Sequence, residues 1–177
     1  TAFAMVREKE RGTIEQLIVT PIRSSELILG KLIPYVVIGY LGFLFSLAIC
    51  IYWFGIPVAG SLGLLLLLGF LFVFCSLAMG MLISTFARTQ LQAMMCMVMV
   101  LLPSILLSGF IFPREAMPPV ISALGYAMPL TWFLVIVRGI ILKGVGIEML
   151  WENVYILLGF TFIILFAAMK RFKKSLD

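Results

Sequence analysis

Long stretches without a charged residue are the main pattern along the chain. The first covers residues 32–87, and its 56 positions are too many for one membrane-crossing helix. A bilayer core of ~30 Å needs about 20 helical residues, so this length suits two helices. The turn-forming cluster 55–61 divides the stretch just after Trp53, an aromatic residue typical of the membrane interface. The pattern predicts transmembrane helices near 32–54 and 62–86.

Two later uncharged stretches complete the set of predicted spans. Residues 89–113 predict a third helix near 89–112, which is expected to bend at Pro103 because proline removes a backbone hydrogen bond. Residues 153–169 predict a fourth helix, and a basic tail, 170–177, follows it.

The segment 116–137 is also uncharged, but three prolines and a glycine would break a helix there twice. With four spans and the N-terminus inside, ten basic residues lie inside and three outside, whereas a fifth crossing would make the count eight against five. Because basic residues concentrate on the cytoplasmic side, four spans are favoured. Residues 113–142 are then predicted to form two short helices that enter the membrane from outside and return. The three outer basic residues, expected to meet lipid headgroups or solvent, are Arg114, Arg138 and Lys143.

The polar segment 1–31 precedes the first span. Its charges at 7–11 are mixed in sign, which does not favour a polybasic lipid-binding patch. Thr13 and Gln16 have the spacing of a capping box, and Pro21 would end the short helix that begins there. That helix carries an apolar stripe made of Ile14, Leu17 and Ile18.

Two interpretations of this short helix stay open on the residues alone. Its apolar stripe could rest on lipid as an interfacial anchor, or it could dock a cytoplasmic partner. In either case the sequence predicts an all-α membrane protein with four transmembrane helices, a cytoplasmic amphipathic helix and a re-entrant extracytoplasmic helix pair.

Composition agrees with a membrane protein. Hydrophobic residues make up 63% of the chain and charged residues 12%, about half the charge of a soluble domain. The net charge is +5. The three cysteines lie far apart inside apolar stretches and are expected to be small buried residues.

The residue types present exclude several kinds of chemistry for this chain. The sequence has no histidine, which excludes Ser-His-Asp and Cys-His triads and imidazole metal sites. Gly30-Lys31 is followed by leucine and lacks the earlier glycine of a phosphate-binding loop, so we expect no ATP hydrolysis by this chain. The predicted spans contain no ionisable Asp, Glu, Lys or Arg, which argues against a proton-coupled carrier.

Small residues recur four apart in the second predicted span. Such spacing lets helices approach closely, within one subunit, at a dimer contact or along a substrate path. The three candidates for helix packing are Ser76, Gly80 and Ser84.

Several motifs, in this order and spacing, resemble the permease subunits of ABC-2 type exporters. They are Arg7-Glu8-Lys9-Glu10-Arg11-Gly12-Thr13-Ile14-Glu15-Gln16-Leu17, Thr20-Pro21, Leu29-Gly30-Lys31, Leu107-Ser108-Gly109-Phe110-Ile111-Phe112-Pro113 with Met117-Pro118, and Pro129-Leu130-Thr131 with Arg138-Gly139-Ile140.

The resemblance implies roles for two groups of residues. The first group would couple the chain to a separate ATPase through connecting and coupling helices, and consists of Glu10, Arg11, Gly12, Thr13, Ile14, Glu15, Gln16, Leu17 and Ile18. The second would form the re-entrant loop, and consists of Pro113, Met117, Pro118, Pro129, Arg138 and Gly139.

The resemblance also implies a function. The chain would be a non-catalytic permease that moves a drug-like or lipid-like substrate out of the cytoplasm, with no cofactor of its own and with ATP and Mg²⁺ bound by the ATPase. Its partners would be that ATPase, a second permease copy or a paralogue, and membrane lipid, without nucleic acid. It would lie in a bacterial inner membrane with both ends cytoplasmic. The alternative is a membrane scaffold that transports nothing.

The family implied by these motifs has six spans. The first two, and the extracytoplasmic domain often placed between them, have no counterpart in this sequence. The short apolar start, residues 1–6, is expected to be the cytoplasmic end of an earlier span.

Overall fold

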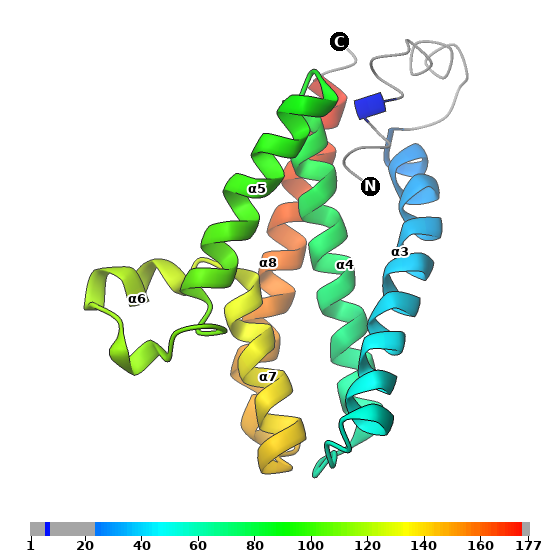
Figure 1. The fold of residues 1–177 in the computed structure, drawn as a ribbon. Coiled ribbons are helices and arrows are strands. Elements are labelled where there is room, and N and C mark those ends of the chain that lie inside the picture. Colours follow the sequence, from blue (N-terminus) through cyan, green and yellow to red (C-terminus); the bar gives the residue numbers. More distant parts are fainter. Residues whose placement is uncertain (1–5, 8–23, 175–177) are drawn as a thin grey trace.

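The computed structural model describes residues 6–7 and 24–174, and within them the chain forms helices joined by turns, with no strand (Figure 1). The proposed coupling residues 10–18 lie outside the described residues. In order, the elements are α3 (Ser24–Ala48), the π-helical turn η1 (Ile49–Trp53), α4 (Leu62–Phe86), α5 (Gln90–Leu107), the 3-10 turn η2 (Arg114–Ala116), α6 (Pro119–Gly125), α7 (Pro129–Lys143) and α8 (Ile147–Lys174).

Four of these helices are long and apolar enough to cross a membrane. They are Leu32–Trp53, Leu62–Phe86, Gln90–Leu107 and Ile147–Arg171. The short helices α6 and α7 are bent by 85° relative to each other, as a broken span or a re-entrant loop would be. The predicted fold class, an all-helical membrane protein with four spans and a bent helix pair, is confirmed.

Two helix boundaries differ from those expected from the charge pattern. Helix α5 ends at Leu107 instead of 112, because Gly109 has a positive φ of 84°, which a helix cannot continue through. Helix α8 begins at Ile147 instead of 153. Glu148 lies in its first turn, where an acidic side chain interacts favourably with the helix dipole, so the helix extends beyond the uncharged stretch.

Side-chain caps set the start of α5 after a short turn. The Thr89 hydroxyl accepts a hydrogen bond from the Gln92 backbone N–H at 3.2 Å, and the Gln92 side chain accepts one from the Arg88 N–H at 2.9 Å. These reciprocal bonds satisfy backbone donors that have no partner inside the helix. The α4–α5 connection is therefore only a few residues long.

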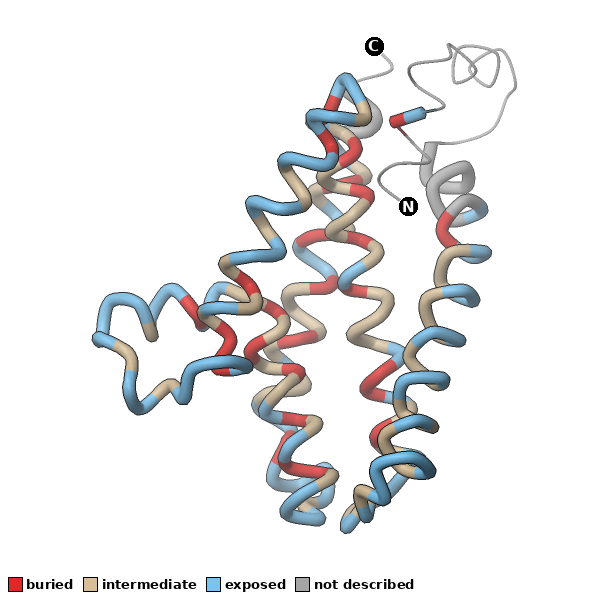
Figure 2. The backbone as a smooth tube through the Cα atoms, in the orientation of Figure 1, coloured by how far each residue is buried: buried red, intermediate tan, exposed pale blue. Residues whose placement is uncertain are grey.

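The core lies between α4, α7 and α8. Helix α4 packs mainly against α8, and α7 packs against both. The Phe72 and Phe133 rings stack with centroids 4.0 Å apart and join α4 to α7. Figure 2 shows buried positions along the facing sides of these helices. The buried residues of this cluster are Leu65, Leu68, Cys75, Ala78, Phe133, Ile136, Ile140, Leu150, Leu157 and Ile164.

Helices α3 and α5 have exposed positions along much of their length (Figure 2), and many of these are large apolar residues. Phe45 on α3 is 69% exposed and Met99 on α5 is 77% exposed. Such surfaces suit contact with lipid or with another membrane-embedded chain, because lipid tails are as apolar as these side chains.

The start of α3, the α4–α5 turn and the end of α8 lie at one end of the bundle, and the α7–α8 turn lies at the other (Figure 1). At the first end the described charged side chains are all basic: Arg7, Arg88, Lys170 and Arg171. At the second, Lys143 is accompanied by Glu148 and Glu152. Among the described side chains, the first end therefore carries basic charge that no acidic group balances, whereas Arg114, Arg138 and Lys143 elsewhere are matched in number by Glu115, Glu148 and Glu152.

Candidate functional site at the bent helix pair

The chain turns sharply where α5 ends. The positive φ of Gly109 directs its carbonyl toward α7, where the Arg138 guanidinium donates a hydrogen bond to it at 2.9 Å. These residues are 29 positions apart in the sequence, so the hydrogen bond connects the end of α5 to α7. Arg138 therefore both anchors the turn and places a positive charge beside it.

Arg114 fixes the loop that follows. Its guanidinium donates to the Ser122 carbonyl at 3.1 Å and lies over the Tyr126 ring, 3.8 Å from the centroid. A cation over an aromatic face is attracted by the ring quadrupole. Among the described residues its buried Nε has no hydrogen-bond partner. Arg114 thus holds the loop against α6.

The corner between α6 and α7 is held by side-chain hydrogen bonds to two backbone carbonyls at the end of α6. The buried Thr131 hydroxyl donates to the Gly125 carbonyl at 2.6 Å, and the Trp132 indole N–H donates to the Tyr126 carbonyl at 2.9 Å. A Cβ at Gly125 would collide with the Leu107 carbonyl of α5. The bend of 85° is therefore stabilised from inside the corner and packed against α5.

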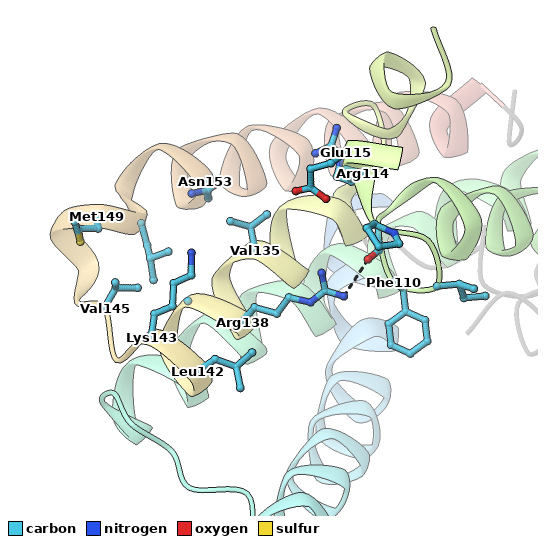
Figure 3. A pocket seen from close by; sticks show the side chains of 15 residues that line it. Phe110, Arg114, Glu115, Val135, Arg138, Leu142, Lys143, Val145, Met149 and Asn153 are labelled. Carbon is cyan, nitrogen blue, oxygen red and sulfur yellow. Dashed lines mark hydrogen bonds between the residues drawn. The ribbon is translucent and has the colours of Figure 1, made fainter. Parts of the chain in front are cut away.

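A pocket of about 670 Å³ opens between this loop, α7 and the start of α8 (Figure 3). Three cations, Arg114, Arg138 and Lys143, share it with Glu115 and Asn153. Figure 3 shows the Lys143 and Asn153 side chains extending into the space between α7 and α8. The apolar and glycine lining consists of Gly109, Phe110, Ile111, Pro113, Val135, Gly139, Leu142, Val145, Met149 and Leu150.

The pocket's donors suit anions better than metals. Within residues 6–7 and 24–174, no three His, Cys, Asp or Glu side chains come together as metal ligands would. The Lys143 ammonium has no hydrogen-bond or ion-pair partner in that part of the chain. Guanidinium and ammonium groups at a membrane protein surface are ready donors to phosphate or carboxylate oxygens.

The structure brings only part of the predicted re-entrant group together. Pro113, Arg138 and Gly139 line the pocket. Met117, Pro118 and Pro129 lie away from it, at the ends of η2, α6 and α7, where they shape the backbone. Their roles in function stay predictions.

Sequence reasoning did not assign Gly109, Lys143 and Asn153 to this site. The signals in the sequence were a Ser-Gly pair before an aromatic run and a lone lysine followed by glycine. Neither signal indicates a partner, because the pocket forms only when α7 folds back beside α8.

The predicted packing group on α4 is divided between environments. Ser76 is exposed, Gly80 is half-buried, and Ser84 is buried with its hydroxyl donating to the Met81 carbonyl at 2.6 Å. The close approach of α3 and α4 is instead at Gly69, where a Cβ would collide with the Phe43 ring. Contact of Ser76 with another chain stays a prediction.

Comparisons with known proteins agree with this architecture. The family model described as ABC-2 type transporter matches residues 1–142. The chain is 38% identical to the probable multidrug ABC transporter permease YbhS of Escherichia coli, over 100% of this chain and 47% of the relative. It is 33% identical to the probable multidrug ABC transporter permease YbhR of the same organism, over 91% of this chain and 44% of the relative.

A more distant relative is ABC transporter G family member 20 of Dictyostelium discoideum, 25% identical over 95% of this chain and 23% of the relative. No solved structure matches the chain significantly. The chain spans about half the length of the bacterial relatives, 44% to 47%. The family match and the four membrane helices with their bent pair lead to one assignment: the chain belongs to the ABC-2 type transporter family.

Proposed function

We propose that the protein is the membrane permease of an ABC exporter and moves a drug-like or lipid-like substrate out of the cytoplasm. The observation that carries this proposal is the family match over residues 1–142. Two bacterial relatives are named as probable multidrug permeases, which supports the substrate class. The interior of the bundle is apolar, which also suits such substrates, since polar ones would need partners there.

The energy for transport would come from a separate ATPase subunit. The segment 10–18 would dock into that subunit, and a second permease, identical or paralogous, would complete the pathway. The exposed apolar faces of α3 and α5 are surfaces on which such a second copy could pack.

The proposed location is a bacterial inner membrane, with the basic end of the bundle in the cytoplasm. Basic residues are retained on the cytoplasmic side during insertion, and the described part of the chain places Arg88, Lys170 and Arg171 at that end.

We expect the two ends of the bundle to react differently with a membrane-impermeant thiol reagent. In a background lacking Cys50, Cys75 and Cys96, Gly146→Cys in the α7–α8 turn should be labelled in intact cells. Ser175→Cys should be labelled only after the membrane is opened. Labelling of Ser175→Cys in intact cells would contradict the proposed orientation.

The purified permease is expected to hydrolyse no ATP, because the sequence has no phosphate-binding loop. ATPase activity should appear when a co-expressed nucleotide-binding subunit is recovered with it. Hydrolysis by a preparation free of other subunits would refute the assignment of the chain as non-catalytic. Failure to recover any ATPase with an inserted permease would favour the scaffold alternative.

A further inference from the structure

The pocket between the 109–115 turn, α7 and α8 carries more positive than negative charge. It has three cations, Arg114, Arg138 and Lys143, against the single carboxylate of Glu115. Arg138 uses one N–H on the Gly109 carbonyl, which leaves other donors of its guanidinium unused by that bond. The pocket is therefore a site for an anion with several acceptor oxygens.

Features around the pocket place it at the membrane–water interface. Trp151 and Tyr155, on the same turns of α8 as Asn153, are 53% and 64% exposed and form an edge-to-face pair with centroids 5.7 Å apart. Trp and Tyr at such positions mark the headgroup level of a bilayer. The pocket thus lies where lipid phosphates are most concentrated.

The rim of the pocket is apolar and open. Phe110 is 62% exposed, Leu142 is 70% exposed and Met149 is 74% exposed. These side chains are next to the cations in the same pocket. A ligand that fits both parts has an anionic head and a hydrocarbon tail, since a free anion would leave the apolar rim in contact with water.

We propose that this pocket binds an anionic phospholipid, with its phosphate on Lys143 and Arg138 and its acyl chains along Phe110, Leu142 and Met149. This binding goes beyond the proposed export function and does not require transport. Arg114 keeps its hydrogen bond to the Ser122 carbonyl and contributes positive charge to the pocket without a direct bond to the lipid.

The test uses the purified protein in neutral-detergent micelles with a fluorescent short-chain phosphatidylglycerol. Lys143→Gln should weaken its binding about fivefold, since one Lys or Arg near anionic lipid contributes ~1 kcal/mol. Lys143 makes no hydrogen bond in the described part of the chain, so this change leaves the fold intact. The matched control is Arg88→Gln, which removes one exposed cation at the opposite end and should leave binding unchanged.

Further arms identify the ligand. Arg138→Gln should also weaken binding about fivefold. Phosphatidylcholine has no net charge, so a labelled phosphatidylcholine should bind the unaltered protein and the Lys143→Gln variant equally. Equal losses in Lys143→Gln and Arg88→Gln would overturn the proposal, because the effect would then be one of overall charge. Displacement of the lipid by inorganic phosphate at millimolar concentration would overturn its lipid part and leave a site for free phosphate.

Discussion

Leu17→Ala combined with Glu15→Arg is expected to weaken association with the ATPase subunit by an order of magnitude or more. The sequence places Leu17 in an apolar stripe and Glu15 on a neighbouring face of the short helix predicted to begin at Thr13. Burying one leucine side chain contributes about 1.5–3 kcal/mol. Because ~1.4 kcal/mol is tenfold in affinity, loss of that contact alone accounts for the expected change.

Recovery of the ATPase with the tagged permease measures this effect, with membrane insertion checked in parallel. A matched control, Leu67→Ala with Glu152→Arg, makes the same two changes on an exposed α4 position and at the opposite end of the bundle. The control should recover the ATPase in full. Equal recovery by the two double variants would mean that the helix is a lipid anchor and not a coupling element.

Gly125→Ala is expected to destabilise the protein by about 1–3 kcal/mol, the usual cost of forcing an extra group into a packed contact. The added methyl would collide with the Leu107 carbonyl, which is backbone and cannot turn aside. Relief requires α6 to move from α5, which would also strain the Thr131 hydrogen bond to the Gly125 carbonyl. Thermal unfolding of the purified protein in detergent reports this loss.

Gly159→Ala is the matched control for this experiment. Gly159 lies within α8, and an added Cβ would have no atom within 4 Å apart from its chain neighbours and the local backbone of its own helix. Alanine is also the better helix former, and the control should be neutral or slightly stabilising. An unchanged unfolding temperature in Gly125→Ala would show that the α5–α6 contact is not closely packed in the membrane protein.

The family resemblance and the number of spans followed from the sequence. Charged residues cannot be left in the hydrocarbon core at low cost, so the uncharged stretches marked the positions of the four membrane helices. Prolines 118, 119 and 129 likewise predicted a broken segment, because each removes a helix hydrogen bond and three lie within twelve residues. The short helix pair was therefore expected, and the structure gives its bend as 85°.

The ends of the helices were less predictable. The limits of the uncharged stretches reflect the cost of placing charge in lipid, whereas the end of a helix is set by the conformation of its backbone. Gly109 ends α5 before the apolar run ends, and Glu148 lies inside α8 although it is charged. The coupling segment 10–18 and the membrane orientation stay predictions from the sequence.

What the tertiary structure alone decided is which residues meet. The sequence marked α7 as part of a re-entrant segment, but only the fold shows Phe133, Ile136 and Ile140 buried among α4 and α8. It also shows Arg138 and Lys143 facing one pocket with Arg114, which lies 24 residues before Arg138. A helix in a membrane is apolar both on the face toward lipid and on the face toward the protein core. The hydrophobic periodicity of the sequence therefore does not identify which face of α7 is buried. The packing of α7 against α4 and α8 determines which face is buried, and it brings Arg138 and Lys143 into one pocket with Arg114.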